Sequence, residues 1–155
     1  MPTRLQDEIK QTKPFPSVGA EAILSILRTA AVLDHALGDT LKGYGVTVTQ
    51  YNVLRILRGA APNGLCGREV GERLIAQVPD VPRLLDRMEE MGLVSRERDA
   101  NDRRHVTARI TEKGNRLLDE SREALDQIEH QRLAGIENAP LQTVVDTLAQ
   151  IRSNS

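Results

Sequence analysis

Arginine is concentrated in one short stretch of the chain. Residues 96–110 read RERDANDRRHVTARI and contain Arg96, Arg98, Arg103, Arg104 and Arg109, interleaved with Glu97, Asp99 and Asp102. A guanidinium group presents five N–H donors in a planar fork, which suits phosphate oxygens and guanine edges. The stretch therefore predicts either contact with a polyanion or a solvated hairpin whose charges pair with one another, each exposed pair contributing little.

A second pair of arginines precedes this stretch. Arg83 and Arg87 are four residues apart and lie off the apolar stripe of Leu84, Leu85 and Met88, so both are expected to point outward from a helix. Pairing with Asp86 or Glu90, or plain solvation, is the alternative interpretation. Near the start of the second helix of a helix-turn-helix, however, such arginines reach guanine bases or phosphates in the major groove.

Asp102 offers a reason for the acidic residues among the arginines. A carboxylate one or two residues from Arg103 and Arg104 can hold an arginine side chain extended and so lower the entropy lost on binding. A hairpin tip with these two arginines is slim enough for a minor groove about 6 Å wide. A solvated hairpin remains the alternative.

Hydrophobic periodicity indicates the elements that would position these residues. Apolar positions at helical spacing predict helices at about 20–41, 48–58, 67–75, 81–91 and 112–134, with a last helix from 138. Alternation predicts strands from residue 93 to about 98 and over 104–110, with Val106, Ala108 and Ile110 facing the core and Asp99 to Arg103 forming the tip. This order is the winged-helix pattern.

Several residues are expected to begin or end these helices. Thr47 and Gln50 have capping-box spacing, Asp80 is a plausible N-cap before Pro82, and Gly92 is suited to end the helix at about 81–91. Cys66 occupies a position where Ser or Thr would be expected as a cap.

Composition excludes several classes of function. Aromatic residues make up only 2% of the chain, so single-strand nucleic-acid binding on stacked aromatics is not expected. The histidines show no recognised metal spacing, and no phosphate-binding glycine loop or nucleophile elbow is present, so we expect neither an enzyme, a metal nor a cofactor. A single cysteine, no membrane span and no signal peptide favour a cytoplasmic protein.

The distribution of charge is uneven although the formal net charge is only −1. Residues 83–116 contain nine Lys/Arg and seven Asp/Glu, whereas residues 117–152 contain three and seven. The outer helices look too long and too apolar for one small core. Their surplus apolar stripes are best covered by a second copy of the chain, which predicts a homodimer.

The stretch from Val46 to Gly114 resembles the winged-helix core of MarR-type transcriptional regulators. Asp102-Arg-Arg104 followed by Ile110-Thr-Glu-Lys-Gly114 is similar to the family signature D-x-R…(L/I)-T-x-x-G. Residues 46–54 resemble the entry to the family's second helix, and residues 84–94 resemble the exit from its recognition helix. The flanking helices also fit in length and order, so the resemblance covers nearly the whole chain.

The resemblance implies an obligate homodimer that binds pseudo-palindromic double-stranded DNA, commonly as a repressor released by a small molecule. By the family pattern Asp102 orients a wing arginine, and Arg104 matches the arginine of the motif. The effector pocket would lie between the dimer helices and the winged-helix core. Its residues are expected to be aliphatic, which favours an apolar or aromatic effector.

The chain departs from the peroxide-sensing members of this family. They carry a reactive cysteine in the first long helix, and here that helix has none. Cys66 lies instead in the helix-turn-helix connection, close to Arg68. We therefore interpret Cys66 as an ordinary structural thiol, with a redox role as the alternative.

We expect a mainly α-helical fold with a small two-stranded wing: residues 1–45 form an arm and dimerisation helix, 46–111 the winged helix-turn-helix core, and 112–155 the C-terminal dimerisation helices. The function predicted is a sequence-specific DNA-binding regulator. A winged-helix protein-interaction module without DNA binding is the alternative. The residues expected to contact DNA are Asp80, Val81, Pro82, Arg83, Arg87, Asp102, Arg103 and Arg104.

Overall fold

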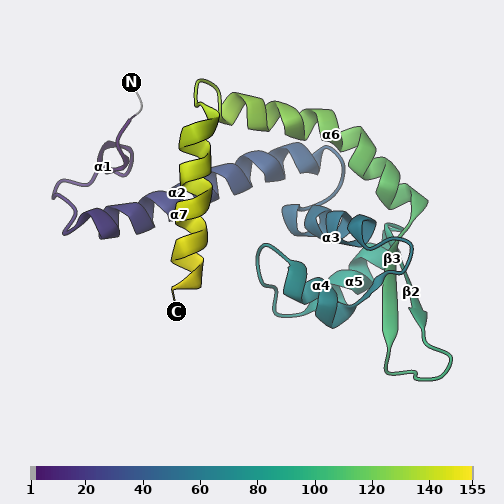
Figure 1. Cartoon of the computed structure of the whole chain (residues 1–155). Coiled ribbons are helices and arrows are strands. Elements are labelled where there is room, and N and C mark those ends of the chain that lie inside the picture. The colour runs from purple at the N-terminus through teal and green to yellow at the C-terminus, as the bar shows by residue number, and fades with distance from the viewer. Residues whose placement is uncertain (1–2, 155) are drawn as a thin grey trace. The chain divides into compact units, whose positions relative to one another are not determined.

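A computed structural model describes residues 3–154, which divide at Ser121 into two compact units (Figure 1). The first unit contains α1 (Leu5–Glu8), α2 (Val18–Lys42), α3 (Val48–Gly59), β1 (Leu65–Cys66), α4 (Gly67–Arg73), α5 (Val81–Glu90), β2 (Val94–Arg98), β3 (Val106–Ile110) and the start of α6. Helix α6 (Glu112–Arg132) continues into the second unit, which also contains α7 (Asn138–Ser153).

The winged-helix core consists of α3, α4, α5 and an antiparallel sheet in the order β1-β3-β2. In Figure 1 the β2–β3 hairpin projects beyond the helices, as a wing does. The expectation of two strands was incomplete, because β1 adds a third, pairing Leu65 with Ala108. A strand of two residues is too short to show an alternating pattern, so β1 could not be predicted from periodicity.

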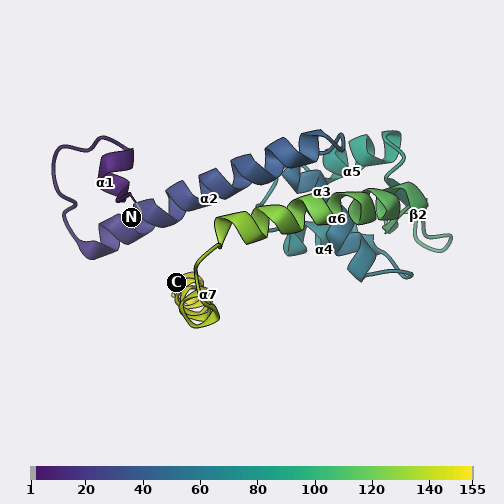
Figure 2. The ribbon, with the colours of Figure 1, turned by 90° about the horizontal axis from the view of Figure 1, so that it is seen from above.

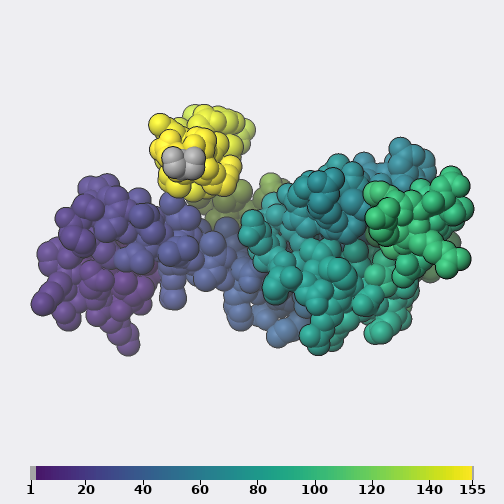
Figure 3. Space-filling model, turned by 90° about the horizontal axis from the view of Figure 1, so that it is seen from below, coloured from purple at the N-terminus to yellow at the C-terminus, as the bar shows by residue number. Residues whose placement is uncertain are grey.

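The core of the first unit is aliphatic, as the scarcity of aromatic residues requires. Its fully buried large side chains are those of Leu41, Val53, Leu54, Leu57, Val70, Met88, Leu93 and Val94. On β3 only Ala108 is fully buried, while Val106 and Ile110 are half-buried rather than inside the core as expected. Figure 3 shows the teal residues of this core as one continuous packed body, with the green hairpin at its edge.

The expected helix boundaries are confirmed where a side chain makes them. The Thr47 hydroxyl accepts the N–H of Gln50 at 3.1 Å, and Gln50 Oε1 accepts the N–H of Thr47 at 3.0 Å. The Asp80 carboxylate accepts the N–H of Arg83 at 3.0 Å and so caps α5. Gly92 ends α5 with φ +76°, a left-handed conformation that glycine adopts without steric cost.

Thr111 and Gly114 join the end of α5 to the start of α6. The Thr111 hydroxyl donates to the carbonyl of Gly92 at 2.6 Å and accepts the N–H of Gly114 at 3.2 Å, which caps α6. A Cβ placed on Gly114 would lie 2.6 Å from the carbonyl oxygen of Leu93. The wing therefore packs closely against the start of α6, because the Thr111 hydroxyl links Gly92, just before β2, to that helix and because Gly114 has no side chain to hold them apart.

Helix α2 is a long helix (Figure 2) that is capped by the Ser17 hydroxyl. It exposes most of its apolar residues. Only Leu41 is buried, whereas Ile23 and Leu27 are each 60% exposed. The arm at the start of residues 1–45 is helical over Leu5–Glu8, and Glu8 lies 3.8 Å from the Arg28 guanidinium.

The second unit has the same character. No side chain of α7 is buried, and its exposed apolar residues include Val144, Val145 and Ile151. Assignment of the outer helices to dimerisation stays a prediction. No helix within residues 3–154 combines the length and apolar character needed to cross a membrane.

Replacing Gly114 with Ala is expected to lower the free energy of unfolding by about 1–3 kcal/mol, the usual cost of overpacking, because the backbone of Leu93 cannot yield. Urea denaturation measures the change. Gly59→Ala is the matched control, since a Cβ there meets nothing within 4 Å and helix propensity alone favours alanine by up to about 1 kcal/mol. Equal effects at both positions would contradict the role assigned to Gly114.

Candidate nucleic-acid interface

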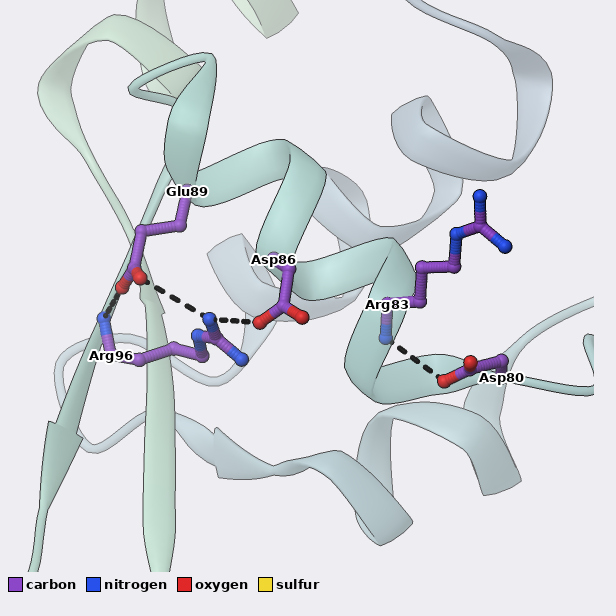
Figure 4. Close-up of polar contacts among 5 residues, drawn as sticks. All are labelled: Asp80, Arg83, Asp86, Glu89 and Arg96. Atoms are coloured by element: carbon purple, nitrogen blue, oxygen red, sulfur yellow. Dashed lines mark hydrogen bonds and ion pairs between the residues drawn. The ribbon is translucent and has the colours of Figure 1, made fainter.

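The first turn of α5 presents an exposed arginine face. Asp80 caps the helix and Pro82 occupies its first turn, where the missing N–H is not needed. The side chains of Arg83 and Arg87 are both exposed, as expected, and neither forms an ion pair within residues 3–154. Figure 4 shows the Arg83 guanidinium extending away from Asp80 and Asp86.

The acidic residues of α5 are engaged by an arginine of the wing instead. Arg96, on β2, hydrogen-bonds through its guanidinium to Asp86 and to Glu89, the latter at 3.2 Å, and its backbone N–H donates to Glu89 at 3.0 Å (Figure 4). The hydrogen bond that Arg96 donates to Glu89 raises the pKa of Arg96; partial burial opposes this effect, and the hydrogen bond to Asp86 adds to it. Of the two alternatives to DNA contact, pairing of Arg83 or Arg87 with Asp86 or Glu90 is therefore absent within residues 3–154, whereas plain solvation of both arginines remains.

The wing tip is braced by Asp102. Its Oδ1 accepts the backbone N–H of Arg104 at 3.1 Å and the Nε of the same residue at 3.3 Å, which leaves the terminal nitrogens of Arg104 free to bind elsewhere. The Arg104 side chain is 93% exposed. The contact between Asp102 and a wing arginine that the resemblance implied is thus present, while a role in DNA binding stays a prediction.

The other arginines of the wing have partners within the protein. Arg98 Nη1 donates to the carbonyl of Arg103 at 3.1 Å, and Arg109 donates to Glu97 at 3.2 Å and to the Pro62 carbonyl at 3.1 Å. With Arg96 held by α5, three of the five arginines serve the structure. Arg103 and Arg104 are left with exposed guanidinium groups at the tip.

The start of β3 differs from expectation in a way that matters for the tip. The strand begins at Val106 rather than at residue 104. The N–H of Asp99 donates to the His105 carbonyl at 2.9 Å, and the N–H of His105 donates to the Asp102 carbonyl at 3.0 Å. These bonds close a turn, so Arg104 belongs to the tip and not to the strand.

A hollow of about 370 Å³ lies between α4, α5 and the wing. It brings together Pro82 and Arg104, two of the expected contact residues, with Arg68 and His105 beside them. Sequence reasoning did not select Arg68 or His105 as contacts. The one sequence feature that could have pointed to Arg68 is its position in the first turn of α4, shortly after Cys66.

Cys66 lines the same hollow and precedes α4, where a cap was expected. Its backbone N–H donates to Glu69 Oε2 at 2.9 Å. This hydrogen bond, together with one from the thiol, lowers the pKa of the Glu69 carboxyl. The thiol is half-buried and not in a disulfide, and its contacts fit the structural interpretation.

Comparison with known proteins agrees with this geometry. Residues 37–121 match the family of transcriptional regulators SarA/Rot. The HTH-type transcriptional regulator YkoM of Bacillus subtilis is 32% identical over 114 residues, which are 74% of this chain and 68% of YkoM. The chain belongs to the winged-helix transcriptional regulators of the MarR/SarA type.

Solved structures of MarR-type regulators share the fold. CouR from Rhodococcus jostii RHA1, solved with p-coumaroyl-CoA, is 26% identical with a TM-score of 0.72, covering 91% of this chain and 98% of CouR. MepR from S. aureus, solved with DNA, is 19% identical with a TM-score of 0.76, covering 85% of this chain and 96% of MepR. The family and the fold are those of transcriptional regulators and not of enzymes.

Replacing Arg96 with Met is expected to lower the free energy of unfolding by about 1 kcal/mol, because two partly exposed ion pairs between β2 and α5 are lost. Urea denaturation measures the change. Arg122→Met is the control, because its pair with Asp126 is highly exposed and 3.9 Å long. An Arg96 variant as stable as the control would contradict the joining role.

Proposed function

We propose that this MarR-type regulator binds a pseudo-palindromic operator in double-stranded DNA as a homodimer, and that it acts as a repressor released by a small molecule. The observation that carries the proposal is the set of exposed arginines on α5 and on the wing tip. Arg83, Arg87, Arg103 and Arg104 are exposed. Of these four arginines, only Arg104 has an ion-pair partner within residues 3–154.

The geometry of the core suits duplex DNA. The N-terminal turn of a recognition helix enters the major groove, so Pro82 and Arg83 would face base edges, with Arg87 one turn further along. Val81 is half-buried, with its methyl groups toward Gly67 and Gly71 of α4, and would support this turn from the inner side. Arg83 can bind guanine O6 and N7 bidentately or bind a phosphate. The capping role of Asp80 places it at the same end of the helix, where it orients the first turn.

The wing suits the adjacent minor groove. Its tip is a narrow turn that carries Arg103 and Arg104, and narrow A·T-rich grooves attract arginine most strongly. Asp102 would lower the entropy cost by holding Arg104 extended before DNA is bound. MepR, which has the same fold and was solved with DNA, supports this use of the fold.

Homodimerisation is supported by the exposed apolar residues of the outer helices. Helix α2 exposes Ile23, Leu24, Leu27 and Leu33, and α7 exposes Val144, Val145 and Ile151. Apolar faces of this length are rarely left in water by a monomer. A symmetric dimer would also match the two half-sites of a pseudo-palindrome.

Release by an effector is proposed because CouR, a structural relative, binds p-coumaroyl-CoA. In the first unit, hollows of about 350 Å³ and 450 Å³ adjoin the end of α2 where it meets α3 and α6. Their linings include Asp34, Lys42 and Arg116 and are more polar than the aliphatic pocket expected. An apolar or aromatic effector therefore stays a prediction.

A winged helix that binds another protein is the second candidate. Such a module has no need for exposed arginines on both α5 and the wing tip, whereas phosphate contact requires them. Salt dependence distinguishes the two, because counterion release makes DNA affinity fall steeply as salt rises.

Replacing Arg104 with Ala is expected to weaken duplex binding by about 1–3 kcal/mol without changing the oligomeric state. Fluorescence anisotropy with a duplex recovered from a random-sequence selection measures the affinity. Arg122→Ala, on α6 and outside the winged-helix core, is the matched control and should bind as the unmodified protein does. Unchanged affinity of the Arg104 variant would remove the wing from the proposed interface.

Replacing Leu27 with Asp is expected to convert the dimer into a monomer at micromolar concentration, because a charge would be buried without a partner in the apolar interface. Sedimentation velocity measures the mass. Ile75→Asp is the control, since Ile75 is 92% exposed in the loop after α4 and outside both apolar helices. A monomeric unmodified protein, or a dimeric Leu27 variant, would contradict the proposed interface.

A further inference from the structure

The wing tip contains one histidine, His105, next to the arginines proposed to contact DNA. We propose that His105 is a further DNA contact, which binds a backbone phosphate in its protonated form and makes operator affinity fall as pH rises. The inference rests on the DNA-binding function proposed above and adds a residue and a mode of regulation to it.

The backbone holds His105 in place while its ring stays accessible. Its N–H donates to the Asp102 carbonyl at 3.0 Å and its carbonyl accepts the N–H of Asp99 at 2.9 Å. The side chain is 71% exposed, and Nε2 lies 3.8 Å from Asp102 Oδ2. His105 therefore stands beside Arg104 on the same carboxylate, with Arg104 on Oδ1 and the imidazole near Oδ2.

Acidic and basic side chains both lie near the imidazole of His105 and affect whether it can bind an anion. Asp102 is the acidic group nearest the ring, and Asp99 lies at the other end of the turn. Cations surround the same region: Arg98, Arg103 and Arg104 on the wing, with Arg68 of α4 and Arg96 of β2 across the hollow that Cys66 also lines. A phosphate entering there would add negative charge beside the imidazole and so favour its protonation.

Protonation changes what the ring can do. A neutral imidazole has one N–H donor, whereas the imidazolium has two and carries a positive charge. One nitrogen can then remain near Asp102 while the other donates to a phosphate oxygen. Arginine keeps its charge at every physiological pH, whereas imidazole is the side-chain group whose charge generally changes between about pH 5 and 8. His105 is the histidine among the tip residues 99–105.

The expected consequence is proton uptake on binding. Affinity for duplex DNA should be about threefold to tenfold higher per protomer at about pH 5.5 than at about pH 7.5, the size of one exposed charge-assisted contact. The slope of log affinity against log salt should be steeper at the lower pH by about 0.9 per protomer, the value for one more neutralised phosphate.

The experiment compares the full-length protein with His105→Gln and His105→Lys on the selected duplex at both pH values. Anisotropy titrations over a salt series give affinity and slope, and calorimetry in two buffers of different ionisation enthalpy counts protons taken up. His105→Gln should bind weakly at both pH values with no proton uptake from this site. His105→Lys, which keeps a charge, should bind tightly at both.

The chain offers matched controls, because its only other histidines are His35 on α2 and His130 on α6. His35→Gln and His130→Gln should retain the full dependence on pH. The inference is overturned by a His105→Gln variant with the pH dependence of the unmodified protein, or by an unmodified protein whose DNA affinity does not change with pH. Absence of duplex binding at both pH values would overturn the proposed function, and the inference with it.

Discussion

The hydrogen bonds of Arg96 with Glu89 and Asp86 are the interaction on which the arrangement of the interface depends. They join β2 to the solvent-exposed side of α5, so the recognition helix and the wing share a fixed spacing. They also occupy the acidic residues that would otherwise neutralise Arg83 and Arg87. A single wing arginine thus helps to hold the two elements at this spacing, and within residues 3–154 it leaves the arginines of α5 without an acidic partner.

The same division of charge explains the sequence of the wing. In a solvated hairpin, opposite charges at adjacent positions would only neutralise one another. Here each acidic residue of the wing makes a different contact. Glu97 holds Arg109, Asp99 closes the tip, and Asp102 braces Arg104. Within the wing, Arg103 and Arg104 at the tip are exposed, in a chain whose formal net charge is only −1. A regulator can present cations to DNA without being a basic protein overall.

Much of this could be predicted from the sequence, because helix caps and apolar periodicity are local signals. Thr47, Asp80 and Gly92 each set a helix boundary with atoms from neighbouring residues, and all three were placed correctly. The strand β1 was missed because its partner β3 is distant in the chain. The partners of Arg96 are only 7 and 10 residues away, but they lie on another element and follow from how α5 packs beside β2. Charge alone did not indicate which of several nearby carboxylates Arg96 would select.

The third strand has a mechanical consequence. Because β1 leads directly into α4 and pairs with β3, the wing and the helix-turn-helix are hydrogen-bonded at both edges of one small sheet. Because of these hydrogen bonds we expect the helix-turn-helix and the wing to move as one body, with a fixed spacing between α5 and the wing tip. In a dimer of two such winged-helix cores, the distance between the cores is what could change. A ligand that stops such a protein from binding its operator would therefore change the distance between the two winged-helix cores. The DNA-contacting residues of each core would keep their arrangement.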